Sequence, residues 1–253
     1  MLVDTHCHVF REYYDDIDEV VRRAKDAGIK AIIVNGVDRK SNEEILELVK
    51  KYDIVYGALG IQPEEVNNCS DDDIVFIEEH INDDKIVAIG EIGLDYHYEC
   101  DKELQKSVFL KQLEIAEKYG KPVIIHSRDC INETYNILKE CNLKGIMHCY
   151  GGSVEMAHMF NKIGFLLGIG GIATFKNAVK IVDVIKEIDL EYIVLETDSP
   201  YLSPEPYRGK RNEPANVKVI AEKIADIKGI EYKDLCDAIG SNVLSLFDKH
   251  LDL

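Results

Sequence analysis

The sequence predicts an α/β protein of the (β/α)8 or TIM-barrel class, folded as a single domain over residues 1–253 with an extra C-terminal helix. Three observations support this prediction. The chain has 253 residues, a length that α/β barrels commonly reach as one domain. Eight short apolar runs alternate with longer amphipathic segments, as repeated β/α units require. Runs such as IIV and YIVL are apolar at consecutive positions, which is typical of parallel strands covered on both faces.

The apolar runs are the expected strands of this barrel. Each is short and rich in β-branched or aliphatic residues, and most are bounded by polar or turn-forming residues. In chain order the eight expected strands are residues 2–7, 31–35, 55–59, 86–91, 123–126, 145–148, 165–169 and 193–196.

Amphipathic segments between the strands are the expected helices, because their apolar residues recur at spacings of three and four. Examples are residues 17–28, 41–52, 72–81, 102–120 and 179–188. Gly28 and Gly120 stand where helices are expected to stop. Two further helices follow the last strand, at residues 215–228 and 232–246. We expect the first to close the barrel and the second to pack outside it.

An open, doubly wound sheet is the alternative architecture. Such sheets usually have fewer strands and carry a glycine-rich phosphate loop after the first strand. Here the first strand ends in THCHVF instead. The barrel is therefore the favoured fold.

Composition limits the possible function. With 46% hydrophobic and 30% charged residues, the chain can bury a full core and has no composition typical of disorder. The seven cysteines include no Cys-x-x-Cys pair, so we expect reduced thiols. The sequence shows no signal-peptide pattern at its start and no apolar stretch of about 18 residues. We therefore expect a cytoplasmic protein that does not associate with membranes.

The net charge is −17, from 30 basic and 47 acidic residues. This balance argues against a protein that coats nucleic acid with a broad basic face. A phosphate group would have to be held by a few local cations.

The opening stretch VDTHCH contains two candidate metal ligands, His6 and His8. Side chains repeat every two residues along a strand, so both imidazoles point to the same side. In a (β/α)8 barrel the active site lies at the carboxyl ends of the strands. If this pair binds metal, other strands should end in ligand residues too.

Four further ligand-type residues do stand at strand ends, and together they predict a metal centre. Glu91 lies in VAIGEIGLDY, His126 in PVIIHSRD, His148 in GIMHCY and Asp198 in IVLETDSP. Four histidines and two carboxylates thus converge from five strands. Nitrogen and oxygen ligands suit zinc, manganese, magnesium, iron or cobalt.

Six ligands exceed what one catalytic ion with an open position needs. A carboxylate such as Glu91 can bridge two ions, and a two-ion centre of this kind activates water and neutralises a developing oxyanion. The pattern therefore indicates a hydrolase. Alternation along the strands is expected to turn Cys7 and Cys149 away from the site. His97, in the loop beyond Glu91, is undecided, and the remaining histidines have no expected role in the site: His80, His158 and His250.

The motifs VDTHCH, GEIGLDY, IHSRD, HCYGG and ETDSPYLSPEPYRGKRNEPANV resemble those of the TatD family of metal-dependent deoxyribonucleases, which are amidohydrolase-like barrels. The similarity runs from residue 3 to about residue 247. The resemblance implies that one ion is held by His6, His8, Glu91 and Asp198, and the other by Glu91, His126 and His148. It also implies hydrolysis of phosphodiester bonds in DNA, often from a 3′ end.

One motif departs from the family pattern. Members often carry Gly-x-His-Pro-His after the third strand, where this chain reads GIQPEE with Gln62 and Glu64. Gln62 can hydrogen-bond a phosphate or a water but cannot donate a proton as an acid, and Glu64 adds negative charge. The departure bears on substrate contacts and on the rate with DNA.

Substrate phosphates need cations on the same rim of the barrel. Arg128 follows the fifth strand, and Arg208, Lys210 and Arg211 follow the eighth. Together with Gln62, Arg128, Arg208 and Arg211 are the expected substrate-binding residues. The expected substrates are DNA ends or short oligonucleotides. We expect the protein to be a monomer without an obligate protein partner.

Asp198 is the expected general base, because a carboxylate beside the metal ligands of the first strand can accept a proton from the attacking water. Two other functions remain open. The first is a binuclear amidohydrolase acting on a small amide, ester or lactone, although those barrels often place a modified lysine where this chain has Glu91. The second is a metal-binding scaffold without catalysis, which the retention of all six ligands disfavours.

Overall fold

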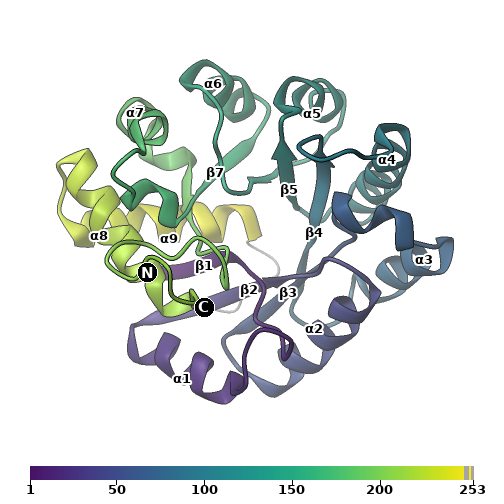
Figure 1. Ribbon diagram of the computed structural model, residues 1–253, viewed down its shortest axis with the longest axis horizontal. Helices are drawn as coiled ribbons and strands as arrows, with labels where there is room; N and C mark the ends of the chain where they lie inside the picture. Colours follow the sequence, from purple (N-terminus) through teal and green to yellow (C-terminus); the bar gives the residue numbers. More distant parts are fainter. Residues whose placement is uncertain (248–250, 252–253) are drawn as a thin grey trace.

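The computed structural model describes residues 1–247 and 251, and its strands form one parallel eight-stranded sheet surrounded by helices (Figure 1). The strands follow one another around the sheet in chain order, so the predicted (β/α)8 barrel is confirmed. His250 lies outside the described residues. The strands are β1 (Leu2–Cys7), β2 (Ile29–Asn35), β3 (Val55–Leu59), β4 (Ile86–Asp95), β5 (Val123–Arg128), β6 (Gly145–Met147), β7 (Phe165–Ile169) and β8 (Ile193–Leu195).

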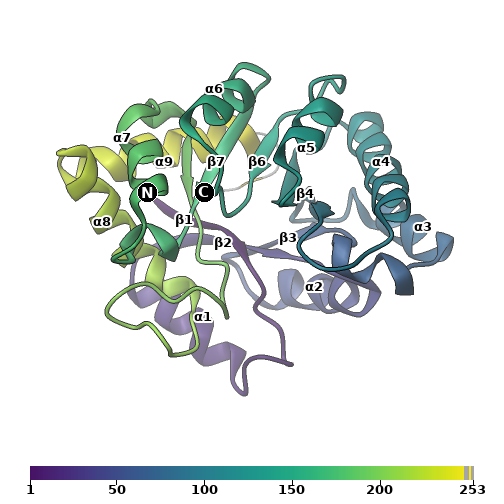
Figure 2. The same cartoon turned by 45° about the horizontal axis from the view of Figure 1, so that its top comes forward.

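Helices alternate with the strands and cover the outside of the sheet, as the tilted view shows (Figure 2). The connections also contain the 3₁₀ turns η1 (Pro63–Asn68), η2 (Gly171–Thr174), η3 (Leu190–Tyr192) and η4 (Pro214–Asn216). The α-helices are α1 (Ile17–Asp26), α2 (Arg39–Lys51), α3 (Asp71–His80), α4 (Lys102–Tyr119), α5 (Ile131–Leu138), α6 (Val154–Lys162), α7 (Val179–Glu187), α8 (Val217–Lys228) and α9 (Tyr232–Phe247).

Local signals set the helix ends. Asp16 caps α1 by accepting a hydrogen bond from Glu19 N, and Asp101 caps α4 in the same way. Gly120 ends α4 in the left-handed conformation, and Gly28 has a positive φ just after α1. Both glycine stops predicted from the sequence are therefore confirmed.

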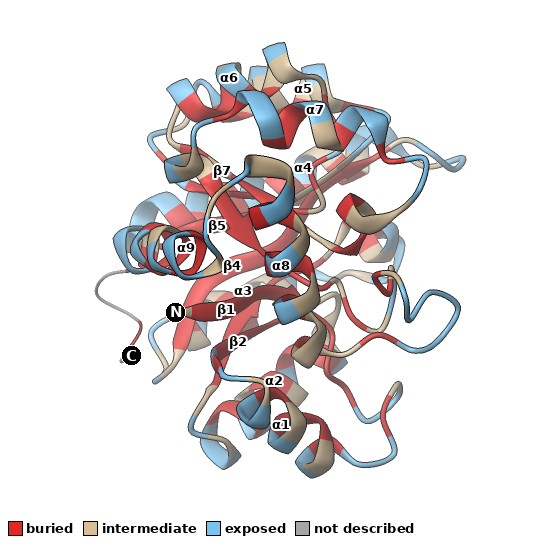
Figure 3. Ribbon diagram, turned by 90° about the vertical axis from the view of Figure 1, so that its left-hand side faces the viewer, coloured by how far each residue is buried: buried red, intermediate tan, exposed pale blue. Residues whose placement is uncertain are grey.

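The core consists of apolar residues on both faces of the sheet and the inner faces of the helices. Ile32, Ile33 and Val34 are all 0% exposed although they are consecutive, as expected for a parallel strand covered on both sides. In Figure 3 the strands are buried while the outer faces of the helices are exposed.

The barrel closes between β8 and β1 mainly through residues that follow β8, since β8 itself is only three residues long. Thr5 Oγ1 donates to Leu195 O over 2.9 Å, and a parallel bridge joins Cys7 to Ser199. Asp198 N then donates to His6 O over 3.0 Å. This seam fixes Asp198 beside the end of β1.

Several strand ends differ from the sequence prediction, and the differences shape the site. β4 and β5 run past Glu91 and His126 because Gly93 pairs with His126 and Asp95 with Arg128. β6 and β8 instead stop at Met147 and Leu195, which leaves His148 and Asp198 in the turns that follow.

The last two helices occupy the predicted places. α8 packs against β1 and β8 at the seam. α9 packs outside the ring of strands at their amino-terminal ends: the Met1 amino group donates to Cys236 O over 2.6 Å, and Asn242 Nδ2 donates to Ile193 O over 2.8 Å. None of the described helices combines the length and apolar character that crossing a bilayer demands.

Candidate metal centre

His6 and His8 lie at the carboxyl end of β1 with their rings turned to the same side. Their Nε2 atoms are 3.1 Å apart, and both side chains are buried, at 0% and 5% exposure. Cys7, between them, points away: its thiol faces Ile33 O of the neighbouring strand β2. Alternation along β1 therefore works as the sequence predicts.

The first group of ligand atoms lies close together. Oε2 of Glu91 lies 3.5 Å from His6 Nε2 and 3.4 Å from His8 Nε2, and Oδ1 of Asp198 lies 3.6 Å from each. Ligand atoms about 2.0 to 2.1 Å from a tetrahedral ion lie roughly 3.3 Å from one another. These four atoms therefore have the spacing and the chemistry to hold one divalent ion.

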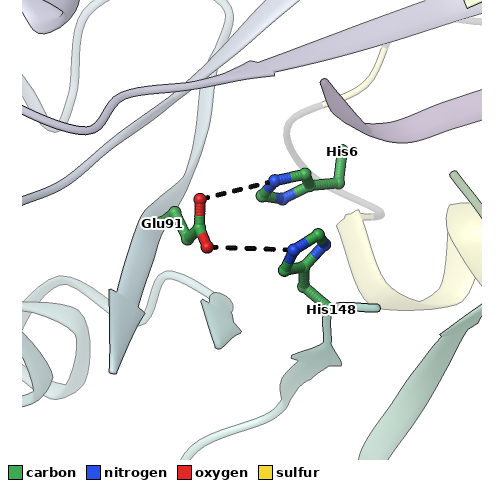
Figure 4. Close-up of side chains that lie close together, drawn as sticks. All are labelled: His6, Glu91 and His148. Atoms are coloured by element: carbon green, nitrogen blue, oxygen red, sulfur yellow. Dashed lines mark ion pairs between the residues drawn. The ribbon is translucent and has the colours of Figure 1, made fainter. Parts of the chain in front are cut away.

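The second oxygen of Glu91 faces another pair of histidines. Glu91 Oε1 lies 2.7 Å from His126 Nδ1 and 3.8 Å from His148 Nε2. Figure 4 shows the carboxylate with one oxygen toward His6 and the other toward His148. The structure therefore gathers all six predicted ligand residues into one cluster, in which both oxygens of Glu91 face histidines.

Two of the histidines are oriented by oxygen atoms behind them. Asn35 O lies 3.0 Å from His8 Nδ1, and Asp95 Oδ2 lies 2.8 Å from His126 Nε2. In a neutral ring, each contact favours the tautomer whose proton is on the nitrogen that faces this oxygen. The nitrogen that faces Glu91 is then free to bind a metal ion.

Glu196 stands behind His148, but as an ion pair. Its Oε1 lies 3.1 Å from His148 Nδ1, as an ion pair without good hydrogen-bond alignment, and accepts a hydrogen bond of 2.7 Å from Cys149 N. Neither Glu196 nor Asp95 was among the residues that the sequence singled out. Their nearness to Asp198 and Glu91, in ETDSP and GEIGLDY, was the available signal.

The electrostatics of the second pair of histidines favour the protonated ring when no metal is bound. Burial alone would lower the pKa of His126, but its hydrogen bonds to Asp95 and Glu91 raise it to about 10. Burial likewise opposes charge on His148, yet the Glu196 carboxylate raises its pKa to about 9. Excess negative charge therefore surrounds these two rings, as a cation site requires.

The first subsite differs. Burial, reinforced by the charge on His148, lowers the pKa of His6 well below its usual value, and the two rings are stacked with centroids 3.5 Å apart. For Glu91, burial would raise the pKa, but His6 and His126 hold it well below its usual range. Glu91 is therefore an ionised carboxylate at neutral pH.

Asp198 is held by the seam of the barrel. Its φ is +54°, a left-handed conformation that aspartate tolerates better than most residues. The preceding Thr197 is clamped to buried Asp4, with Thr197 N donating to Oδ1 over 2.9 Å and Oγ1 donating to Oδ2 over 2.6 Å. Burial raises the pKa of Asp198 to about 6, partly offset by His148 and His8.

The prediction for Cys149 is wrong. Its thiol is close enough to His148 and Asp198 to form a possible metal-binding group with them, and it lines the adjoining cavity. Strand alternation does not apply, because β6 ends at Met147 and Cys149 has a φ of +45° in the turn that follows. Burial raises the pKa of this thiol well above its usual value.

A cavity of about 950 Å³ adjoins the cluster and is lined by His126, His148 and Asp198. The ligand side chains are therefore open to a substrate at this end of the barrel. Of the predicted substrate-binding residues only Arg128 lines this cavity; the sequence did not single out its two lysines or its tyrosines: Lys102, Lys180, Tyr96, Tyr150 and Tyr201.

The other predicted rim residues lie further out. Arg208 and Arg211 are on an exposed loop, with Arg208 stacked over the ring of Phe175 at 3.8 Å and Arg211 Nη1 donating to Tyr13 O. Lys210, between them, is exposed as well. Gln62 lies at the start of η1.

Glu64, in the same turn, and His97, after β4, also lie outside the ligand cluster. Glu64 lines a separate small hollow. His97 is 42% exposed and its Nδ1 lies 2.8 Å from Asp129 Oδ2. His80 and His158, for which no role in the site was expected, lie in α3 and α6.

Comparison with known proteins gives a consistent result. The sequence model of the family described as "TatD related DNase" matches residues 3–248. An uncharacterized metal-dependent hydrolase of Bacillus subtilis, YabD, is 42% identical over 252 residues, which cover 98% of this chain and 99% of that protein.

Solved structures are similar as well. The crystal structure of YjjV, a TatD homolog from Escherichia coli, has a TM-score of 0.93 and 31% identity, covering 98% of each chain. The phosphotriesterase homology protein of Escherichia coli, solved with phosphate in its active site, has a TM-score of 0.72 at 15% identity. It covers 97% of this chain and 98% of its own, and shows a shared fold only.

Proposed function

The chain belongs to the TatD family of metal-dependent hydrolases, and from that premise we propose that it is a two-metal phosphodiesterase that shortens DNA from its 3′ end. Its substrates are DNA ends or short oligonucleotides. The cofactors are two divalent ions of zinc, manganese or magnesium.

The observation that carries this proposal is the position of Glu91 between two groups of ligand atoms. Its oxygens lie 3.4 Å from His8 Nε2 on one side and 2.7 Å from His126 Nδ1 on the other. A bridged pair of ions suits displacement at phosphorus, where charge develops on both the attacking and the leaving oxygen.

The divalent ions would supply Lewis-acid chemistry, polarising a phosphoryl oxygen and lowering the pKa of water. The chain's own residues have separate tasks. Asp198 borders both the ligand cluster and the cavity, so its carboxylate takes the proton of the attacking water. Arg128, on the cavity wall, holds a substrate phosphate in bidentate fashion.

The lining of the cavity offers contacts for a nucleotide chain. Lys102, Arg128 and Lys180 supply positive charge for phosphates, beside the acidic side chains of Asp129, Glu133 and Asp198. Tyr201 is 51% exposed and its ring centroid lies 6.4 Å from that of His8. A base adjacent to the scissile phosphate can stack on this ring, in the sequence-independent way common to single-strand binders.

The proposal is tested by digesting single-stranded oligonucleotides labelled at the 5′ end, with and without a blocked 3′ end, in the presence of Mg²⁺, Mn²⁺ or Zn²⁺. We expect a ladder of shortened labelled products that the 3′ block abolishes. A parallel panel of lactones and hydantoins is the control for the amidohydrolase alternative. Turnover of that panel with intact oligonucleotides would refute the proposal, and no turnover of any substrate in a metal-loaded protein would favour the scaffold alternative.

A further inference from the structure

The two ion subsites differ in how closely carboxylates approach their histidines. In the first, Glu91 Oε2 and Asp198 Oδ1 lie 3.4 to 3.6 Å from both histidines. In the second, Glu91 Oε1 lies 2.7 Å from His126 Nδ1, while Asp198 Oδ1 approaches His148 alone, at 3.9 Å from its Nε2. Two neutral imidazoles and one carboxylate whose charge is shared with the other subsite attract a divalent cation weakly. The second subsite therefore needs negative charge from residues that do not touch the ion.

We infer that Asp95 and Glu196 are positioning residues that give the second subsite its affinity for metal. Asp95 fixes the tautomer of His126, and both carboxylates supply negative charge behind the two rings. The inference rests on the two-ion centre of the proposed function.

Asp95 is fixed firmly enough for this task. It is 3% exposed, and its Oδ2 lies 2.8 Å from His126 Nε2 while Oδ1 accepts a hydrogen bond of 2.9 Å from His97 N. The backbone of Asp95 is paired with Arg128 at the extended end of β4 and β5. When His126 is neutral, as metal binding through Nδ1 requires, the contact with Asp95 Oδ2 keeps its proton on Nε2.

Glu196 is buried more deeply, at 0% exposure. Its Oε1 lies 3.1 Å from His148 Nδ1, while its Oε2 has no hydrogen-bond partner among the described residues. The Glu196 carboxylate packs directly against Gly168, where a Cβ would lie 2.1 Å from Oε2. Burying a carboxylate with an unpaired oxygen is costly unless positive charge lies nearby, and a loaded second subsite would supply that charge.

Among the described residues, no carboxylate pairs with the outer ring nitrogens of the first subsite. His8 is backed by a neutral carbonyl, Asn35 O, and His6 Nδ1 has no hydrogen-bond partner in the part of the chain that the structure describes. The carboxylates behind the histidines are therefore confined to one side of Glu91. Their removal should weaken one ion and spare the other.

The test compares wild type with Asp95→Asn and Glu196→Gln, which keep the shape of each side chain and remove its charge. The metal content of each protein is measured by equilibrium dialysis against graded free Zn²⁺ and against graded free Mn²⁺, so that both binding steps are resolved. In each variant we expect the affinity for the second ion to fall roughly 10- to 100-fold, while the affinity for the first stays within a few-fold of wild type.

Asp83→Asn is the matched control. Asp83 Oδ2 also lies 2.8 Å from a histidine, His80 Nδ1, but that histidine belongs to α3 and is outside the ligand cluster. Both ions should bind this variant as they bind wild type. Gly168→Ala provides a variant without a charge change: it displaces Glu196 by contact and should also weaken the second ion. Circular dichroism of each metal-free protein separates these effects from loss of fold.

The outcomes distinguish the two claims. Wild type that binds two ions, with second-ion affinity unchanged in both Asp95→Asn and Glu196→Gln, would overturn the inference and leave the two-ion centre intact. Equal weakening of both ions would also overturn it. Wild type that never binds more than one ion would overturn the two-ion centre and the inference together.

Discussion

Asp198 is the residue in which metal binding and proton transfer meet. Its Oδ1 lies 3.6 Å from both His6 Nε2 and His8 Nε2, and its side chain is 14% exposed at the edge of the cavity. In the ion-free protein burial raises its pKa to about 6, and a bound cation would favour the ionised form that a base requires.

We therefore expect Asp198→Asn to lower the hydrolysis rate by at least about 10²-fold, within the usual range for a lost acid-base group. The measurement is the rate of oligonucleotide cleavage at saturating metal. Circular dichroism and metal content serve as controls, because five ligand residues remain. A variant that keeps more than about a tenth of the wild-type rate would show that Asp198 is not the base.

The ligand residues could be anticipated from the sequence because strand periodicity and the barrel rule are local arguments. His6 and His8 share a side because they are two positions apart. Asp95, which orients His126, could not be anticipated in this way, because it reaches His126 only through the tertiary pairing of β4 with β5. Cys149 was misplaced because the exact end of β6 determines where strand alternation stops.

Among the elements, the paired strands β4 and β5 position Glu91, the carboxylate shared by the two proposed ion subsites. Gly93 has a φ of +146°, and a Cβ there would lie 2.0 Å from His126 O. The close approach of the two strands at this point sets Glu91 against His126. A side chain at position 93 must therefore push the two ligands apart.

Gly93→Ala should destabilise the protein by more than Gly120→Ala, which shares a positive φ but has nothing within 4 Å of the added methyl group. The control should cost roughly 1 to 2 kcal/mol of unfolding free energy from the left-handed conformation alone. Denaturant unfolding of the metal-free proteins measures both values. Equal losses in the two variants would mean that the contact with His126 O carries no strain.

The loop after β8 is the second element with a stated role. Arg208→Ala and Arg211→Ala should lower turnover of oligonucleotides more than turnover of a small chromogenic phosphodiester, because only the longer substrate has flanking phosphates to hold. Lys233→Ala removes a positive charge from α9, at the opposite end of the barrel, and is the control. Since Arg211 also bonds Tyr13 O, equal losses on both substrates would assign these arginines to the folding of the loop.

At this scale the sequence predicted which elements exist better than where they end. All eight expected strands are present, because continuous apolar runs identify doubly covered strands. The extension of β4 to Asp95 and the early stop of β8 at Leu195 depend on pairing with neighbouring strands. The sequence of one segment does not show how that segment pairs, so these ends could not be predicted from it.

In the whole molecule, the apolar core that stabilises the fold is separate from the proposed metal centre. The apolar core runs through all eight strands and into α8 and α9, while the ligand cluster occupies one end of the barrel. We expect chelation to abolish hydrolysis and largely preserve the fold, measured by activity and by circular dichroism on one sample. Complete unfolding on chelation would show that the core does not suffice without metal.

The most direct test of the two-ion centre is anomalous diffraction from crystals of the protein loaded with Mn²⁺ or Zn²⁺. We expect two anomalous peaks on opposite sides of the Glu91 carboxylate. One should lie among His6 Nε2, His8 Nε2 and Asp198 Oδ1, and the other beside His126 Nδ1 and His148 Nε2. A single peak at full metal loading, or two peaks that leave Glu91 unbound, would contradict the bridged centre on which the proposed phosphodiesterase depends.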